Sequence, residues 1–321
     1  MPPADRVEPR AIGIDIGGTK IAGGVVTEDG RILDRTRVPT PRDEGEATLV
    51  AVLAAADELL ARNPGVAAIG VGAAGLVEWP GGHARWAPNN SYRHLELRRL
   101  VGERTGLPTL VDNDGNAAAW AEARFGAGAG CDDLVLVTVG TGIGGGLVLG
   151  GRLYHGEHGF AGELGHLIVA PDGDRCACGN RGCLEAMASG SALGRLGREA
   201  AAADPEGRLA ALAAQAGGPV TGELVFAAAS EGDKPALALF ERVGTWLGVG
   251  IASLVTIFDP DVVVVGGGVA ATGELLLAPA RASFERYVHG RGHRDLPPVV
   301  PTQLGGDAGL VGAATLALGG R

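Results

Sequence analysis

Short apolar runs separated by glycine-rich turns recur along the chain and predict a mixed α/β protein. Longer segments with apolar residues on one helical face predict helices between these runs. The predicted strands cover residues 11–16, 21–26, a third run ending at 38, then 67–71, 108–111, 134–139, 147–149 and 261–265. The predicted helices cover about 47–62, 95 to the capping Gly106, 116–125, 234–258, a segment from about 273, and 310–318.

The pattern of strand, glycine-rich turn and strand occurs twice, over residues 11–26 and 134–149. This repetition predicts a duplicated α/β unit with a cleft between the two copies. The later part of the chain is mostly helical, and no low-complexity linker interrupts it. Two closely joined lobes are therefore expected.

Length and charge limit the classes of function. A chain of 321 residues has room for two domains, and its formal net charge of −10 argues against a broad nucleic-acid surface. No uninterrupted apolar run reaches the roughly 20 residues of a membrane span, and residues 1–10 lack the apolar core of a secretory signal. The sequence predicts a cytoplasmic protein without membrane or nucleic-acid partners.

Two glycine-rich loops are candidates for phosphate binding. The first is Asp15-x-Gly17-Gly18-Thr19-Lys20, in which backbone N–H groups could hold phosphate oxygens and the carboxylate could hold Mg²⁺. The second runs from Gly140 to Gly146 and is predicted to be a turn. A plain hairpin turn is the alternative interpretation of the first loop.

The spacings Gly140-x-Gly142-x-x-Gly145 and Gly266-x-Gly268-x-x-Ala271 also match a dinucleotide-binding pattern. The first leads into a strand instead of a helix, and too little chain follows the second to complete such a domain. No Gly-x-x-x-x-Gly-Lys-Ser/Thr motif is present. A dehydrogenase and a P-loop enzyme are therefore disfavoured.

Three of the four cysteines, Cys176, Cys178 and Cys183, fall within eight positions. Such clustering favours a metal over disulfides in a reducing compartment, and His166 is the best fourth ligand for a closed, structural Zn²⁺ site. Three free thiols on a loop are the alternative. Cys131 stands apart.

Asp112-Asn113-Asp114-Gly-Asn116 lies where a strand is predicted to end and a helix to begin. Sugar phosphorylation needs a base for the hydroxyl proton and a neighbour that fixes the hydroxyl, which an Asn-Asp pair can supply. A helix N-cap is the alternative. Glu163, His166 and Glu185 could bind sugar hydroxyls, although surface acids are the simpler interpretation of the two glutamates.

These motifs occur together and in order, and in this combination the chain resembles the ROK family (repressors, open reading frames, kinases), in particular its actinobacterial-type glucokinase branch. The resemblance covers about residue 10 to the end, and Cys-x-Cys-Gly-x-x-Gly-Cys-x-Glu is its most specific motif. It implies a two-lobed actin-like ATPase fold. The expected small lobe comprises residues 1–113 and 307–321, and the large lobe, with the zinc loop, residues 114–306.

The resemblance also implies roles for single residues. Asp114 would be the general base in the transfer of phosphate from ATP to glucose. The sugar ligands would be Gly75, Asn89, Asn113, Asp114, Glu163, His166 and Glu185. The nucleotide and its Mg²⁺ would meet Asp15, Gly17, Gly18, Thr19, Lys20, Gly140, Thr141, Gly142, Gly144, Gly266, Gly267 and Gly268. Zn²⁺ would be held by His166, Cys176, Cys178 and Cys183, and the protein would be a homodimer or homotetramer.

Other members of the family are transcriptional repressors, but only about 10 residues precede the first phosphate strand, which disfavours a DNA-binding module. A non-catalytic sugar sensor would be expected to lose the base or the phosphate loops. Kinases for mannose, fructose, N-acetylglucosamine or N-acetylmannosamine are closer rivals. Ala74 stands where many members carry proline, which leaves sugar specificity open, and polyphosphate could replace ATP.

Overall fold

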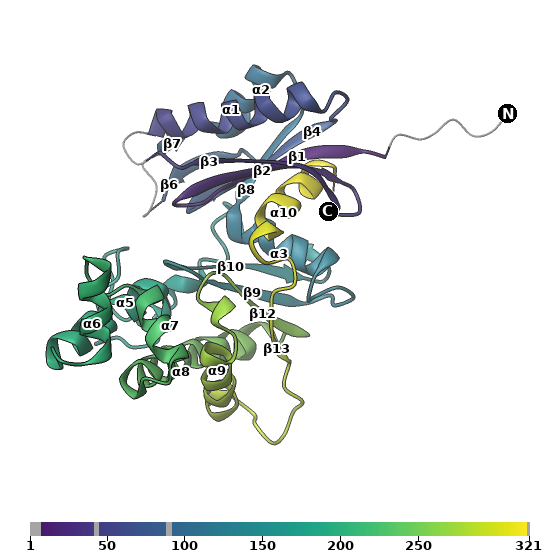
Figure 1. Cartoon of the computed structure of the whole chain (residues 1–321). Coiled ribbons are helices and arrows are strands. Elements are labelled where there is room, and N and C mark those ends of the chain that lie inside the picture. The colour runs from purple at the N-terminus through teal and green to yellow at the C-terminus, as the bar shows by residue number, and fades with distance from the viewer. Residues whose placement is uncertain (1–7, 42–44, 88–91, 320–321) are drawn as a thin grey trace. The chain divides into compact units, whose positions relative to one another are not determined.

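Two five-stranded sheets organise the computed structural model of the protein (Figure 1). The structure describes residues 8–41, 45–87 and 92–319. Contacts between residues divide the chain into two units. The first comprises residues 1–134, 146–162 and 303–321, and the second comprises residues 135–145 and 163–302.

The first sheet has the strand order β3-β2-β1-β4-β8. Its strands are β1 (Arg10–Ile16), β2 (Lys20–Thr27), β3 (Ile32–Pro39), β4 (Ala68–Ala73) and β8 (Thr109–Asn113). β1, β2 and β3 pair antiparallel, whereas β1, β4 and β8 run parallel. Since parallel strands end at the same edge, this topology gathers the residues that follow β1, β4 and β8.

Helices cover both faces of this sheet (Figure 1). α1 (Gly45–Arg62) and α2 (Leu97–Thr105) lie on one face, and α10 (Ala308–Ala317) and α3 (Asp114–Phe125) lie on the other. α10 approaches the sheet closely because glycines face it: a Cβ on Gly13 or Gly70 would overlap a carbonyl oxygen of α10. Gly312 of α10 meets α3 in the same way, at the Ala117 carbonyl.

A small antiparallel sheet in the first unit was not expected from the sequence. It comprises β5 (Leu76–Glu78), β6 (His83–Trp86) and β7 (Arg93–Leu95). These strands have three or four residues, which is too short for an alternation of apolar and polar positions to stand out.

The second sheet, most of which belongs to the second unit, has the order β11-β10-β9-β12-β13. Its strands are β9 (Leu134–Val139), β10 (Ile143–Leu149), β11 (Arg152–Leu153), β12 (Val262–Gly266) and β13 (Val299–Pro301). The helices of this part of the chain are α4 (Leu184–Ala188), α5 (Gly190–Ala203), α6 (Arg208–Ala216), α7 (Gly222–Ser230), α8 (Lys234–Phe258) and α9 (Glu274–Tyr287). Short 3₁₀ turns are η1 (Leu164–His166), η2 (Ala270–Thr272) and η3 (Gly305–Asp307).

Most predicted elements are present, but several boundaries differ from the prediction, and two of these differences have a clear local cause. The predicted turn over residues 140–146 ends early, because β10 begins at Ile143. Glycines continue into the strand for close packing, since a Cβ on Gly145 would press on the Leu136 carbonyl and on Leu164. α3 begins at Asp114, two residues before the predicted start, because Asn113 caps it.

The contact-based units differ from the two predicted lobes, whose boundaries lie at residues 113/114 and 306/307. The division into those lobes stays a prediction. α3 groups with the first unit because it packs against α10. Residues 146–162 belong to the first unit as well.

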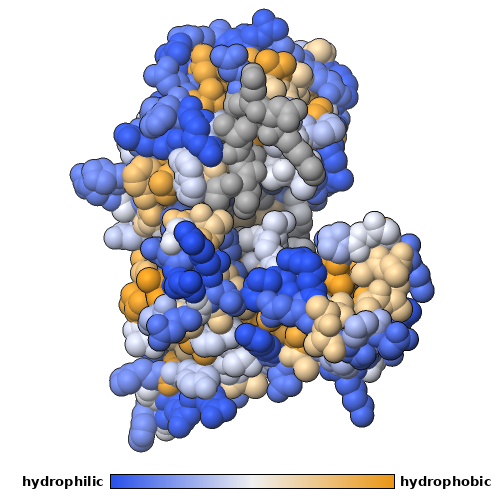
Figure 2. Space-filling model, turned by 90° about the vertical axis from the view of Figure 1, so that its left-hand side faces the viewer, coloured by the Kyte–Doolittle hydropathy of each residue, from blue (hydrophilic) through white to orange (hydrophobic). Residues whose placement is uncertain are grey.

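Within the described ranges, one helix, α8, is long and apolar enough to cross a membrane by length and composition. Of its most apolar window, 56% is buried inside the protein, where α8 packs along α9 and contacts α4, α5 and α7. This packing accounts for its apolar composition. On the face drawn in Figure 2, hydrophobic residues form small groups among hydrophilic ones.

Candidate functional site

The carboxyl-terminal edge of the first sheet collects acidic residues of the first unit. In the strand register Asp15 of β1 faces Gly72 of β4, and Gly72 faces Asp112 of β8. A Cβ added to Gly72 would lie 3.5 Å from the Cα of Asp114 and 3.8 Å from Oδ1 of Asp15. Three strands that are far apart in sequence thus bring Asp15 and Asp114 to one edge, the usual place for ligands in α/β folds.

Asn113 is held in one orientation by two hydrogen bonds. Its Oδ1 accepts from the backbone N–H of Asn116 at 3.1 Å and so caps α3, as the alternative interpretation predicted. Its Nδ2 donates to the carbonyl of Gly75 at 3.0 Å. A primary amide has two N–H groups, so one donor of Asn113 remains for a ligand.

Two carboxyl groups at this edge, those of Asp114 and Asp15, have raised pKa values. Burial raises the pKa of Asp114, and the N–H of Gly115, which donates to Oδ1 at 2.9 Å, offsets only part of this effect. Burial, and then the negative charge of Asp114, raise the pKa of Asp15 to about 7, against a lowering by Lys20. A cation at this edge would relieve the repulsion between the two carboxylates.

The loop between β1 and β2 is a hairpin turn, as the alternative interpretation predicted. Thr40 fixes it: its Oγ1 donates to the carbonyl of Gly17 at 2.7 Å, and its N–H donates to the carbonyl of Thr19 at 3.1 Å. Gly18, Thr19 and Lys20 are exposed. The turn therefore presents these residues to solvent beside Asp15, where they could bind phosphate oxygens.

In the second unit, the predicted nucleotide-binding loops 140–142 and 266–268 both flank the end of β9. The N–H of Gly190, at the start of α5, donates to the carbonyl of Gly140 at 2.8 Å, and the N–H of Val269 donates to the carbonyl of Val139 at 2.9 Å. Gly267 has a φ of +92° and lies against Val139, which excludes a side chain there. The tertiary structure thus joins two loops that lie more than a hundred positions apart in the sequence.

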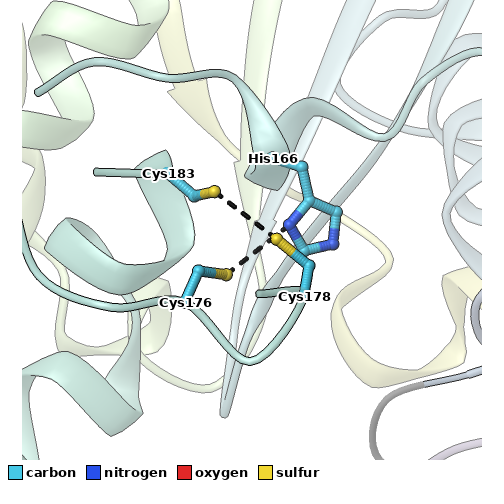
Figure 3. Close-up of side chains that lie close together, drawn as sticks. All are labelled: His166, Cys176, Cys178 and Cys183. Atoms are coloured by element: carbon cyan, nitrogen blue, oxygen red, sulfur yellow. Dashed lines mark hydrogen bonds between the residues drawn. The ribbon is translucent and has the colours of Figure 1, made fainter. Parts of the chain in front are cut away.

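The predicted metal ligands of the second unit converge (Figure 3). The ligand atoms of His166, Cys176, Cys178 and Cys183 all lie within 4.8 Å of one another. Nδ1 of His166 is 3.7 Å from Sγ of Cys176, and Sγ of Cys178 is 3.7 Å from Sγ of Cys183. A tetrahedral Zn²⁺ with bonds of about 2.3 Å to sulfur requires ligand separations of about 3.8 Å, so this donor set fits zinc.

Two glycines shape the cysteine loop. Gly179 and Gly182 have φ values of +100° and +67°, which favour glycine, and a Cβ on Gly182 would overlap the Ala170 carbonyl. The N–H of Cys176 donates to the carbonyl of Asn180 at 2.8 Å and closes the loop. The spacing Cys-Gly-x-x-Gly-Cys therefore has a backbone reason as well as a ligand reason.

Burial raises the pKa of the Cys176 thiol and raises the pKa of Cys183 to about 12, where the neighbouring thiols add to the effect. Three thiolates at this distance would repel one another without a cation. Metal binding at this site must therefore release protons.

The candidate sugar ligands of the second unit surround the cysteine loop. Nε2 of His166, on the opposite side of the ring from the sulfur contact, is 3.9 Å from a carboxylate oxygen of Glu163. Glu185 accepts from the N–H of Ile143 at 3.0 Å, and its other oxygen is 3.7 Å from Sγ of Cys176. Glu185 thus joins the cysteine loop to the glycine loop before β10, a link that the sequence did not predict.

Two further groups of the first unit were missed at the sequence level. Nε2 of His155 lies 2.7 Å from Oδ2 of Asp112, and the two side chains are 12% and 3% exposed. The buried Glu122 accepts N–H groups from Ala127, Gln303 and Leu304. Neither group has a local motif, because the partners lie 43 and up to 182 positions apart. Asn89, a predicted sugar ligand, lies outside the described residues.

The sequence profile of the ROK family matches residues 11–319. The chain is 43% identical over 308 residues to the glucokinase of Streptomyces coelicolor, covering 95% of this chain and 96% of the relative. It is 38% identical over 312 residues to the N-acetylmannosamine kinase of Escherichia coli O157:H7, covering 96% and 98% of the two chains.

Among solved structures, the chain is similar to a ROK family glucokinase from Streptomyces griseus in complex with glucose and AMPPNP. The TM-score is 0.88 at 46% identity, with 97% of this chain and 99% of that chain covered. This likeness confirms the predicted two-lobed, actin-like ATPase fold.

Proposed function

Because the chain belongs to the ROK family, we propose that it is a glucokinase, an ATP-dependent sugar kinase that phosphorylates the 6-hydroxyl of glucose. The observation that carries this proposal is the Asn113–Asp114 pair, one residue oriented by two hydrogen bonds and the other a carboxyl group of raised pKa at a helix start. The similarity to glucokinases over nearly the whole chain supports the choice of glucose.

Asp114 acts as the general base. As the 6-oxygen of the sugar forms its bond to the terminal phosphorus of ATP, the hydroxyl proton moves to the Asp114 carboxylate, and the bond from phosphorus to the bridging oxygen breaks to release ADP. A pKa raised by burial supports this role, because a base is most effective when its pKa approaches the working pH.

One side-chain N–H of Asn113 donates to the carbonyl of Gly75. The other N–H of this amide binds a sugar hydroxyl, and Gly75 therefore lies beside the sugar ligand Asn113. Glu163, His166 and Glu185 supply further contacts to hydroxyl groups. His166 can bind both the metal and the sugar, because its Nδ1 faces the cysteines and its Nε2 faces Glu163. Asn89 completes the proposed set of sugar ligands.

The nucleotide binds to the glycine-rich loops. Gly17, Gly18, Thr19 and Lys20, with Gly140, Thr141, Gly142 and Gly144, face the phosphates, and Gly266, Gly267 and Gly268 lie near the nucleoside. Asp15 holds Mg²⁺, directly or through water; this ion neutralises the charge of the phosphates. The exposed turn at residues 18–20 beside a carboxyl group of high pKa supports this assignment.

His166, Cys176, Cys178 and Cys183 hold a structural Zn²⁺, which orders the loop that bears the sugar ligands. All four positions of a tetrahedral ion are filled by protein, so the metal has no open position for chemistry. We also propose a cytoplasmic location and a homodimer or homotetramer, as the family resemblance implies.

The test is turnover of purified protein with MgATP and a panel of hexoses that includes glucose, mannose, fructose, N-acetylglucosamine and N-acetylmannosamine. Release of ADP is measured with Asp114→Asn as the control, and polyphosphate is tried as a second donor. Turnover on glucose that depends on Asp114 is expected. Preference for another sugar would correct the substrate, and folded, zinc-containing protein that is inactive on every sugar would contradict the proposal.

A further inference from the structure

The pair formed by His155 and Asp112 lies next to the first turn of α3, the helix that begins with the proposed base Asp114. Nε2 of His155 lies 2.7 Å from Oδ2 of Asp112, and both side chains are largely withdrawn from solvent. Because a carboxylate only accepts hydrogen bonds, Nε2 carries the hydrogen of this contact. Both residues belong to the first unit.

The His155 ring is held in place by its own neighbours. It stacks on Trp79 with ring centroids 4.1 Å apart and an angle of 5° between the planes. The N–H of Trp79 donates to the carbonyl of His158 at 3.2 Å, and Gly159, with a φ of +91°, lets the backbone lie against Val77 and Trp79. The donor is therefore oriented before any ligand binds.

The other carboxylate oxygen of Asp112, Oδ1, accepts hydrogen bonds from two residues next to the proposed base. Oδ1 accepts from the backbone N–H of Asn113 at 2.7 Å and from Nδ2 of Asn116 at 2.9 Å. Asn116 in turn donates its backbone N–H to Oδ1 of Asn113. Asp112 thus connects His155 to the first turn of α3, where Asp114 begins the helix.

We propose that His155 is a positioning residue, which acts through Asp112 to fix Asn113 and Asp114 for proton transfer; this inference rests on the proposed function. Loss of the Nε2 donor leaves a buried carboxylate oxygen without its partner, which is unfavourable, and we expect the first turn of α3 to shift in response. Displacement of a reacting group by about 1 Å can lower a rate by about 100-fold.

The test separates the stacked ring from the hydrogen bond. His155→Phe keeps a ring against Trp79 and removes the donor, whereas His155→Gln replaces the ring but can supply an N–H to Asp112. We expect kcat with glucose to fall about 10- to 100-fold in His155→Phe, with KM for ATP unchanged, and His155→Gln to recover most of it. The matched control is His158→Gln, three positions further along the chain. This change keeps the main-chain carbonyl of residue 158, which accepts the N–H of Trp79.

A double-mutant cycle distinguishes positioning from a structural role. If His155 acts through the base, adding His155→Phe to Asp114→Asn should lower kcat by less than about twofold. An equal fall in both backgrounds, or a fall fully explained by the folded fraction measured by circular dichroism, would overturn the inference. Should His155→Phe not fold, His155→Asn, which is too short to reach Asp112, takes its place with the same expectation.

The two proposals fail in different ways. Parent protein that phosphorylates glucose while His155→Phe matches it in kcat would remove the positioning role and leave the kinase intact. Parent protein that is folded but inactive on every sugar would remove both.

Discussion

The edge of the first sheet that bears the proposed base and the cysteine loop of the second unit both contain groups with raised pKa values, but they are held by different means. Parallel strand pairing fixes Asp15 and Asp112, and α10 packs closely against the same strands. The cysteine loop has little regular structure: beyond η1 and α4, isolated bridges such as Ile168 with Cys183 support it. Packing orders the first region, whereas the proposed Zn²⁺ would order the second.

Glycine illustrates the same difference. Gly13 and Gly70 lie in β-strands, and they are required because a neighbouring backbone comes too close for a Cβ. Gly179, which has open space around it, is required because its φ value is positive, and Gly182 combines a positive φ with a carbonyl that comes too close for a Cβ. One region uses glycine to bring regular elements together, and the other uses it to bend a loop around ligands.

The sharpest test of the first region is Asp114→Asn. It keeps the shape of the side chain but removes the base, so kcat should fall by roughly 100-fold or more while glucose binding is largely retained. Zinc content should stay at the parent level, because the metal ligands lie in the other unit. Steady-state kinetics, sugar titration calorimetry and metal analysis measure the three quantities. Unchanged turnover would exclude Asp114 as the base.

Cys178→Ser should affect the second region, and here the metal and sugar binding should be lost first. Loss of one of four ligands should release zinc, lower the melting temperature and raise KM for glucose about tenfold or more, since the metal orders the loop. Cys131→Ser, outside the cluster, is the matched control and should keep its zinc. A Cys178→Ser protein with full metal content and parental KM would show that packing alone holds the loop.

A smaller effect is expected from Asp15 in protein without ligands. Its pKa is about 7 in the folded state against an ordinary value of 3.8, so the folded state binds the proton more tightly than the unfolded state. The free energy of unfolding should therefore fall as pH rises from about 4 to 7, by at most on the order of 1 kcal/mol per pH unit.

Urea unfolding of the parent and of Asp15→Asn, from pH 5 to 8 without Mg²⁺ or nucleotide, measures this slope. In Asp15→Asn, the free energy of unfolding should fall less with rising pH than in the parent. Asp172→Asn, which changes an exposed residue, should show the same fall as the parent. Parallel pH profiles for the parent and Asp15→Asn would contradict the pKa assignment.

Local patterns in the sequence predicted much of the regular structure. The helix predicted over residues 234–258 has those bounds in the structure, and Gly106 ends α2 in a left-handed conformation, as expected. The cysteine spacing led to the four side chains that the structure gathers. These features depend on periodicity, turn chemistry or residues close in sequence, so the sequence carries them directly.

The sequence by itself determined the family, the order of most strands and helices, and the residue types available for a base, phosphate loops and a metal. Only the tertiary structure decided that Asp15 and Asp114 share a sheet edge, that Glu185 contacts the glycine loop through the N–H of Ile143, and that His155 stands behind Asp112. These contacts join residues 42 to 99 positions apart. No local periodicity records such pairs, because strand order and packing bring them together only when the chain folds.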